Sequence, residues 1–347
     1  MIKIDKINIA DDNPCFIIAE AGVNHNGDIN LAYKLIDAAI TSGADAIKFQ
    51  TYKTENLVTR DAQKAAYQKN YTNEDESQFE MLKKLELSEN AFINIQKYCK
   101  NNNIIFLSSP FDHESIQFLE SLEISAYKVP SGEITNSSYL IEIAKKQKPV
   151  ILSTGMSTLE EVRSAVDIFR KNNNENIVLL HCISNYPADP KDVNLRAMKT
   201  LEKTFNLPVG FSDHTSGIEI PLAARALGAC IIEKHFTLDN DLEGPDHAAS
   251  LEPGKFAEMV KGIRKIEMAL GNGEKKPTAN ELTIAKSVRK SLVANKNINA
   301  GTVLEKSMID IKRPGTGLSP DLLEFIVGKE IIVGVEEGTL FNMEMFK

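Results

Sequence analysis

The sequence predicts a closed eight-stranded α/β barrel followed by a small β-rich domain. Three observations support this fold class. Eight short apolar runs alternate with amphipathic segments through the first 270 residues, polar residues gather at the carboxyl end of nearly every run, and the alternation stops near residue 271. Short continuous apolar strands that alternate with helices indicate a parallel sheet covered on both faces.

The expected strands are short apolar runs separated by helix-like segments. They are residues 16–20, 46–50, 104–109, 126–133, 150–155, 177–182, 209–214 and 231–236. One of the helix-like segments between them, residues 158–172, begins at an N-cap, Ser157 or Thr158, and carries Glu160 and Glu161 in its first turn. Hydroxyl caps and early acidic residues are start signals of a helix.

An open, doubly wound sheet shows the same alternation and is the alternative. Such a sheet concentrates its polar residues at one switch point, whereas a barrel builds its site from the loops after every strand. The distribution here favours the barrel. Residues 51–75 form a polar insert that is too long for an ordinary connection. We expect it to be a lid or wall of the site, with a surface excursion as the alternative.

The expected domains are a catalytic barrel over residues 1–270, a linker over 271–286 and a β-rich domain over 287–347. Residues 297–309 and 334–346 resemble each other, since both place Gly-Thr after a polar turn and before an apolar pair. A unit of about 60 residues is marginal on its own. We therefore expect it to dock on a barrel, its own or a partner's.

The composition excludes several classes of protein. A net charge of −8 argues against a nucleic-acid partner, because phosphate backbones are bound by clustered Lys and Arg. No run reaches the roughly 20 apolar residues of a membrane span, and the N-terminus lacks the apolar core of a signal peptide. The four cysteines are far apart, which suits reduced, buried thiols. We expect a cytoplasmic protein without a membrane partner.

Polar residues at the strand ends are the candidates for a site. Side chains two residues apart share a face of a strand, and charged side chains are rarely buried unless they are paired or used. The residues expected at the barrel mouth on these grounds are Glu20, Lys48, Gln50, Lys128, Ser131, Glu133, Ser153, Ser212, His214, Glu233 and His235.

His214 and His235 end consecutive expected strands, so they would be neighbours in a barrel. Two neighbouring imidazoles with oxygen donors nearby suit Mn²⁺, Mg²⁺ or Zn²⁺. Two hydrogen-bonded core histidines are the alternative. His25 is expected to stabilise a turn, and His181 to orient a neighbour in the site.

Lys48, Lys128 and Arg313 are the candidates for neutralising a phosphate and a carboxylate. The runs SSP (108–110), PSGE (130–133) and STGMST (153–158) offer further hydroxyl and backbone donors for an anion. Lys128 also raises the alternative of a Schiff-base aldolase. That alternative ranks lower because the polar surroundings suggest no depressed pKa for Lys128.

Several strings carry a family likeness. They are AEAGVNHNG (19–27), KFQT (48–51), KVPSGE (128–133), LSTGM (152–156), GFSDHTSG (210–217), EKHFT (233–237), GPDH (244–247) and KRPGTG (312–317). In order and spacing they resemble the sialic acid synthase family, which includes N-acetylneuraminate synthases and legionaminate synthases. The likeness covers essentially the whole chain.

The resemblance implies a TIM barrel followed by an antifreeze-like (SAF) domain, in a domain-swapped homodimer. It implies that Arg313 reaches the partner's site and binds the sugar's N-acetyl group, and that His214 and His235 bind Mn²⁺ or Mg²⁺. Phosphoenolpyruvate would be held by Lys128, Ser109, Ser131, Ser153, Ser184 and Ser212. The sugar would be faced by Glu20, Gln50, Tyr186, Glu233 and Asp246.

The activity implied is condensation of phosphoenolpyruvate with N-acetylmannosamine to give N-acetylneuraminate, with C–O cleavage and release of phosphate. Lys48 and Lys128 would offset the negative charge, and Glu20 or Glu133 would handle the proton of the attacking water. An N,N'-diacetyllegionaminate synthase acting on 2,4-diacetamido-2,4,6-trideoxymannose is the alternative, followed by a 3-deoxy-keto-acid synthase. Some family members carry Asn in place of Ser184, which leaves phosphate binding intact with a different donor. Some carry an aromatic residue in place of Arg289 beside the sugar end, which leaves the sugar open. From another class, a binding protein with an inert barrel is a further alternative.

Overall fold

The computed structural model describes residues 2–10, 13–65, 72 and 76–347. The chain divides into two compact units, Met1–Gly271 and Asn272–Lys347. Each unit is built around its own apolar core.

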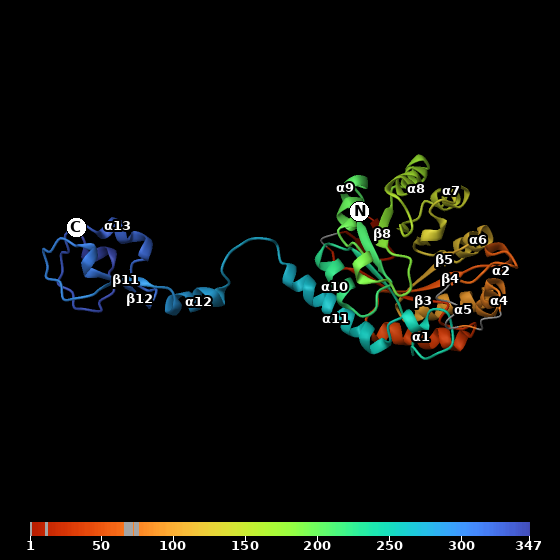
Figure 1. The fold of residues 1–347 in the computed structure, drawn as a ribbon, viewed down its shortest axis with the longest axis horizontal. Coiled ribbons are helices and arrows are strands. Elements are labelled where there is room, and N and C mark those ends of the chain that lie inside the picture. The colour runs from red at the N-terminus through yellow and green to blue at the C-terminus, as the bar shows by residue number, and fades with distance from the viewer. Residues whose placement is uncertain (1, 11–12, 66–71, 73–75) are drawn as a thin grey trace. The chain divides into compact units, whose positions relative to one another are not determined.

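Within the described residues, eight parallel strands form one sheet in the first unit (Figure 1). They are β3 (Phe16–Gly22), β4 (Ala46–Thr51), β5 (Ile105–Pro110), β6 (Tyr127–Val129), β7 (Val150–Ser153), β8 (Ile177–Cys182), β9 (Val209–Asp213) and β10 (Ile231–His235). The order is β5-β4-β3-β10-β9-β8-β7-β6, and β5 and β6 at its two ends lie against each other. The sheet therefore closes into the predicted barrel, and every expected strand overlaps an observed one.

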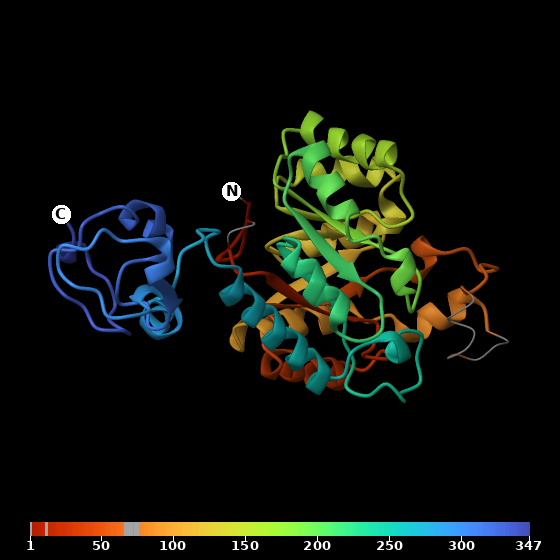
Figure 2. The same ribbon diagram turned by 60° about the vertical axis from the view of Figure 1, so that its left-hand side comes forward.

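Helices surround the barrel (Figures 1 and 2). They are α1 (Ile29–Thr41), α2 (Thr54–Leu57), α4 (Gln78–Leu85), α5 (Glu89–Asn101), α6 (His113–Ser121), α7 (Ser137–Lys145), α8 (Leu159–Lys171), α9 (Ala197–Phe205), α10 (Glu219–Ala226) and α11 (Pro253–Leu270). The last of them, α11, lies against α1, so the first and last of these helices are neighbours on the outside of the barrel.

Local chemistry explains where these helices begin. Thr158 caps α8 and forms a reciprocal capping box with Glu161, which identifies the N-cap among the two predicted candidates. The apolar face of α8, including Val162 and Phe169, is buried against the barrel. An equivalent box between Ser77 and Glu80 starts α4.

The two faces of each strand belong to different cores. On β3, Ile17 and Ala19 pack against the helices, whereas Phe16 and Ile18 point into the barrel. An antiparallel hairpin, β1 (Ile2–Ile4) and β2 (Ile7–Ile9), adds Ile4 to the inward core at the amino ends of the strands. The sequence analysis did not predict this hairpin.

Part of the insert after β4 is described. Its described residues include α2 and lead into α4, which packs against α2. The expectation that residues 51–75 form a lid or wall falls partly on 66–71 and 73–75, which lie outside the described residues.

The cysteines follow the expectation from their spacing: in the described part of the chain, all four are free and buried. Among the helices described, none combines the length and the apolar composition needed to cross a membrane.

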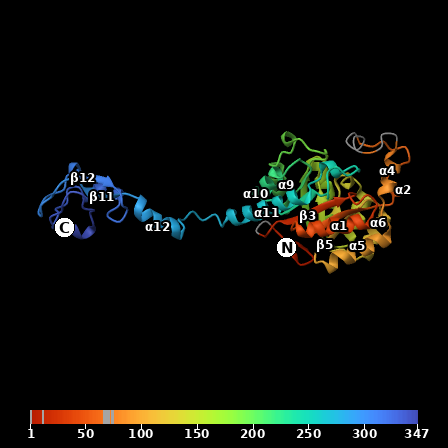
Figure 3. The ribbon, with the colours of Figure 1, turned by 90° about the horizontal axis from the view of Figure 1, so that it is seen from below.

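The second unit has a small core of its own. The unit comprises α12 (Ala279–Val288), the antiparallel pair β11 (Ser291–Ala294) and β12 (Ile309–Lys312), and α13 (Leu323–Ile326) (Figure 3). Leu292, Ile326 and Phe341 are fully buried in its core. Helix α12 lies largely within the segment that the sequence suggested was a linker.

Candidate active site

A cavity of about 330 Å³ opens at the carboxyl ends of the barrel strands. Every predicted site residue lines it except Glu133 and Arg313. The lining residues predicted from the sequence are Glu20, Lys48, Gln50, Ser109, Lys128, Ser131, Ser153, Ser184, Tyr186, Ser212, His214, Glu233, His235 and Asp246. Period-two alternation therefore brings strand ends from all around the barrel to one place.

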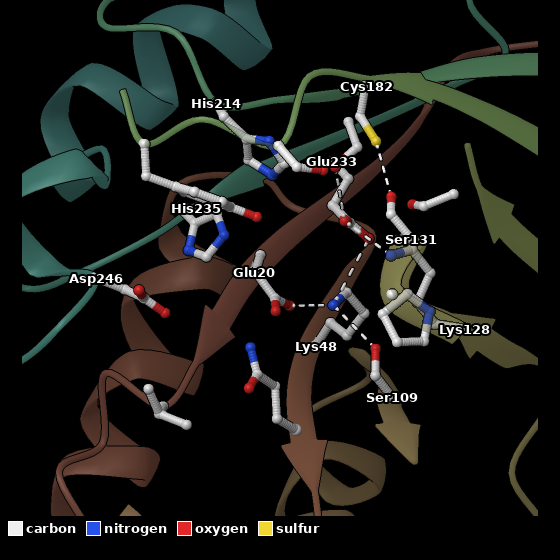
Figure 4. A pocket seen from close by; sticks show the side chains of 18 of the residues that line it. Glu20, Lys48, Ser109, Lys128, Ser131, Cys182, His214, Glu233, His235 and Asp246 are labelled. Atoms are coloured by element: carbon white, nitrogen blue, oxygen red, sulfur yellow. Dashed lines mark hydrogen bonds and ion pairs between the residues drawn. The ribbon is translucent and has the colours of Figure 1, made fainter. Parts of the chain in front are cut away.

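Two lysines and two carboxylates form the buried centre of this cavity (Figure 4). Lys48 Nζ lies 2.7 Å from Glu20 Oε2, 3.3 Å from Ser109 Oγ and 3.8 Å from Glu233 Oε2. Lys128 Nζ lies 3.2 Å from Glu233 Oε1. The carboxylate of Glu233 is thus shared between the two ammonium groups.

The charges of these groups follow from burial and pairing. Burial alone would raise the pKa of Glu233, but Lys128 and Lys48 outweigh it and hold that pKa at about 2. Burial raises the pKa of Glu20 to about 7, against the opposing effect of Lys48. At neutral pH, two ammonium groups thus face one fully ionised carboxylate and one that is partly protonated. The surplus is positive, which suits an anionic ligand.

Burial also lowers the pKa of Lys128, although Glu233 opposes the shift. This corrects the expectation that polar surroundings leave Lys128 with an ordinary pKa. The reason is that its polar neighbours are themselves buried, so solvent does not stabilise the ammonium group.

Hydroxyl groups converge at one end of the cavity. The backbone N–H of Gly155 donates to Ser131 Oγ at 2.9 Å, and Cys182 Sγ lies 3.2 Å from the same oxygen. A Cβ on Gly155 would lie 2.4 Å from Ser184 Oγ, so only glycine leaves this space open. The buried Ser153 Oγ has no hydrogen-bond partner among the described residues. Together these groups form a cradle of donors suited to a phosphate or carboxylate.

The two predicted histidines lie side by side near this centre, with ring centroids 5.5 Å apart. The ring of Tyr186 lies 4.2 Å from that of His214. Burial lowers the pKa of His214 to about 4 and that of His235 well below its usual range. Both imidazoles are therefore neutral, which is the form that binds metals.

The hydrogen bonding of this pair fits a metal ion. His214 Nδ1 donates to the carbonyl oxygen of Ile183 at 2.6 Å, which leaves the Nε2 lone pair available. His235 Nδ1 is buried and finds no partner within the described residues. No group of three or more His, Cys, Asp or Glu side chains that could hold a metal occurs among those residues. The two imidazoles are therefore the side chains that would hold such an ion.

The opposite end of the cavity is formed around Gly22, which follows a β-bulge and has a φ of +53°. A Cβ there would lie 3.4 Å from Gln50 Nε2 and Glu20 Oε1 and 3.7 Å from Asp246 Oδ2. Burial raises the pKa of Asp246 to about 6, with Lys48 opposing the shift. This end offers both hydrogen-bond donors and hydrogen-bond acceptors, which the hydroxyl and amide groups of a sugar require.

Two predicted site residues lie elsewhere. Glu133 ends the 3-10 turn Ser131–Glu133 after β6, where strand alternation no longer applies, and its carboxylate accepts from Asn136 Nδ2 at 2.8 Å. Arg313 is exposed in the second unit.

Two further histidines were also considered from the sequence. His181 points away from the cavity, with Nε2 bonded to the carbonyl of Val193. His25 accepts from the N–H of Gly27 at 3.1 Å, which confirms the predicted turn.

Some lining residues were missed. Cys182 lies two residues after Leu180 on β8, so the alternation rule could have predicted that it faces the cavity. Val23, Met81 and Leu82 gave no comparable signal, because apolar residues outside strands are usually core residues.

The comparisons with known proteins agree with this geometry. The sequence profile of the NeuB family matches residues 35–275, and that of the SAF domain matches residues 289–347. The chain belongs to the NeuB family. This NeuB-family chain is 50% identical to an N,N'-diacetyllegionaminic acid synthase of Legionella pneumophila over 334 residues, covering 95% of this chain and 94% of the relative. It is 51% identical to an N,N'-diacetyllegionaminic acid synthase of Campylobacter jejuni over 328 residues, covering 94% and 98%.

The solved structure of a related enzyme also supports the assignment of this chain to the NeuB family. It is an N-acetylneuraminic acid synthetase from Leptospira borgpetersenii in complex with citrate, with a TM-score of 0.72 and 38% identity, covering 82% of this chain and 94% of that one. The predicted barrel, SAF domain and synthase class are thereby confirmed. The chain is an enzyme of the sialic and legionaminic acid synthase family. The relatives favour the predicted alternative, the legionaminate synthase, over the N-acetylneuraminate synthase.

Proposed function

We propose that this enzyme is an N,N'-diacetyllegionaminic acid synthase that condenses phosphoenolpyruvate with 2,4-diacetamido-2,4,6-trideoxymannose. The observation that carries the proposal is one cavity in which two lysines and a hydroxyl cradle lie beside two neutral histidines. This cavity occurs in a chain half identical to two synthases of that name.

The anionic substrate would lie in the positive half of the cavity. Lys48 and Lys128 supply charge for the phosphate and carboxylate groups, and Ser131 and Ser153, which line the same cavity, supply hydroxyls that can donate hydrogen bonds. Because Ser153 Oγ is unpaired with any described residue, binding an anion there would replace no existing protein hydrogen bond.

The reaction then follows from the chemistry of the enol. C3 of phosphoenolpyruvate forms a bond to the aldehyde carbon of the open-chain sugar, and water captures the cationic C2. Collapse of this tetrahedral species breaks the C2–O bond and expels phosphate. Glu20, whose pKa of about 7 lies near neutral pH, is placed to accept the proton of the water. The other predicted candidate, Glu133, does not line the cavity.

A divalent ion would be held by His214 and His235, and we include Mn²⁺ or Mg²⁺ in the proposal. Such an ion supplies Lewis acidity toward the aldehyde oxygen when it is bound. Chelation should abolish turnover, and His214→Ala or His235→Ala should remove Mn²⁺ binding, measured by equilibrium dialysis. Turnover should fall about hundredfold, which corresponds to about 2.7 kcal/mol of lost transition-state stabilisation. Full turnover after exhaustive chelation would remove the ion from the proposal.

The proposal also includes a domain-swapped homodimer in which Arg313 acts in the partner's site. Arg313 is exposed on a unit with a core of its own, so it is free to serve another barrel. Arg313→Ala mixed with a Lys128→Met chain should recover activity through heterodimers. Absence of recovery despite measured subunit exchange would count against the swap.

A Schiff-base aldolase is favoured by one observation, the lowered pKa of Lys128. The ion pair with Glu233 opposes that role because it favours the charged amine. Borohydride trapping with pyruvate would reveal such an aldolase, and we expect no trapped adduct.

The direct test is phosphate release from phosphoenolpyruvate with each sugar and Mn²⁺, followed by mass spectrometry of the product. We expect turnover with 2,4-diacetamido-2,4,6-trideoxymannose to exceed that with N-acetylmannosamine. Higher kcat/KM for N-acetylmannosamine would restore the N-acetylneuraminate alternative.

A further inference from the structure

One wall of the cavity is apolar. Val23, Met81, Leu82 and Phe111 line it beside the polar groups already described. Val23 and Met81 are buried, and they belong with these neighbours to a small apolar cluster that is separate from the barrel core. Two of the four side chains come from α4, which follows the long insert after β4.

The wall lies at the sugar end of the cavity. Val23 directly follows Gly22, the residue whose missing Cβ leaves space among Glu20, Gln50 and Asp246. The hydroxyl cradle around Ser131 and Gly155 instead follows β6 and β7. The anion cradle and the apolar wall therefore belong to different ends of the site.

Several contacts hold the wall in place. The hydroxyl of Tyr52 donates to the carbonyl of Leu82 at 3.1 Å, and the Tyr52 ring meets Phe111 edge-on. The carboxylate of Glu86, just after α4, accepts from the N–H of Thr54 at 3.0 Å and its hydroxyl at 2.8 Å. A wall fixed in this way can discriminate between substrates by shape and polarity.

Resting on the proposed function, the orientation of the sugar follows. Its aldehyde carbon must meet C3 of phosphoenolpyruvate at the anion end, so its C4–C6 portion extends toward the other end. The two candidate acceptors differ there. One carries hydroxyls at C4 and C6, whereas the other carries an acetamido group at C4 and a methyl group at C6.

We propose that the wall formed by Val23, Met81, Leu82 and Phe111 is the specificity determinant that selects an acceptor with a methyl group at C6 and a methyl-terminated acetamido group at C4, in place of hydroxyls. Apolar side chains contact a methyl group favourably but offer a hydroxyl no hydrogen bond in exchange for water. The expected discrimination is tenfold to about hundredfold, because apolar pockets read single methyl or hydroxyl differences only to that extent.

The test uses near-isosteric polar substitutions, Leu82→Asn and Met81→Gln, in the full-length enzyme loaded with Mn²⁺. The ratio of kcat/KM for 2,4-diacetamido-2,4,6-trideoxymannose to that for N-acetylmannosamine should fall about tenfold in each variant. The KM for phosphoenolpyruvate should stay within about twofold of the wild-type value, since the anion end is untouched. The ratio is independent of the folded fraction, because both sugars are measured on one preparation.

Leu57→Asn is the matched control. Leu57 packs against the same apolar cluster but is not among the residues that line the cavity. It should lower stability without changing the ratio. Val23→Thr tests the wall from a different element and should lower the ratio as well.

The outcomes separate the two proposals. Equal loss of kcat/KM for both sugars in Leu82→Asn, Met81→Gln and Val23→Thr would overturn the role of the wall and leave the proposed function standing. A wild-type enzyme that releases phosphate with neither sugar would overturn the proposed function itself.

Discussion

The two ends of the same strands differ sharply inside the barrel. At the amino ends the inward side chains are apolar, as with Phe16 and Ile231, and the hairpin that carries Ile4 packs with them. At the carboxyl ends the inward side chains are charged or polar, as with Glu20 and Glu233. The change from one to the other takes only a few residues along each strand.

The difference separates stability from function along one strand. Ile231, Glu233 and His235 follow each other on the inward face of β10. The first packs in the core, the second pairs with both lysines, and the third lines the cavity. Buried charges are costly to desolvate and persist only when they are paired. The carboxyl ends are therefore the part of the core where ligand binding takes precedence over packing.

The largest expected effect comes from removing one of these paired charges. Lys128→Met should reduce kcat/KM for phosphoenolpyruvate by about a thousandfold, because loss of a donor that stabilises developing charge costs about that much. It should also lower the free energy of unfolding by about 3 kcal/mol, since Glu233 loses its nearer cation. Phosphate release and urea unfolding measure the two effects.

A double variant separates these consequences. Lys128→Met combined with Glu233→Gln removes the unpaired charge and should restore most of the lost stability. Activity should stay low because the cation is still missing. Recovery of activity in the double variant would show that Lys128 serves only to neutralise Glu233.

The stability of the fold should also become sensitive to acid through a residue near the carboxyl ends of the strands, His25 in the loop after β3. Burial lowers the pKa of His25 to about 4, with Asp28 opposing the shift. An unfolded histidine takes up a proton below about pH 6.5, but the folded one does so only below about 4. The unfolded state therefore binds more protons in this window, and stability falls as the pH falls from 6.5 to 4.

The variant that tests this is His25→Gln, which removes the titrating group. Between pH 7 and pH 4 the wild type should lose about 3 kcal/mol more unfolding free energy than the variant, as linkage requires for a shift of this size. Urea unfolding at a series of pH values measures the difference, from which groups common to both proteins cancel. Parallel pH curves for the two proteins would show that His25 titrates normally.

The sequence predicts the fold and the site wherever side chains alternate regularly along a strand. The apolar runs predicted every barrel strand, and the rule that residues two apart share a face placed Lys48 with Gln50 and Ser212 with His214 in one cavity. Repeating backbone geometry makes such inferences possible, because one known residue sets the direction of its neighbours.

Predictions failed where that geometry ends. Glu133 was expected in the site as the last residue of the strand expected over 126–133, yet that strand ends at Val129 and the 3-10 turn after it directs Glu133 toward Asn136. Met81 and Leu82 come from a helix whose approach to the barrel depends on long-range contacts, including the bond from Tyr52. The depressed pKa of Lys128 was missed because burial is a property of the folded structure.

The smallest expected effects compare two positions on one strand, β7. Ile151 is fully buried in the inward core, and Ser153, two residues on, lines the cavity with its hydroxyl unpaired to any residue described. Ile151→Val should cost about 1 kcal/mol of unfolding free energy through the lost methylene and leave kcat and KM unchanged. Ser153→Ala should leave stability unchanged, because no protein hydrogen bond is broken, and raise the KM for phosphoenolpyruvate about tenfold through one lost charge-assisted bond. The opposite pattern, with Ile151→Val impairing catalysis and Ser153→Ala impairing stability, would mean that the boundary between packing and binding lies elsewhere on the strand.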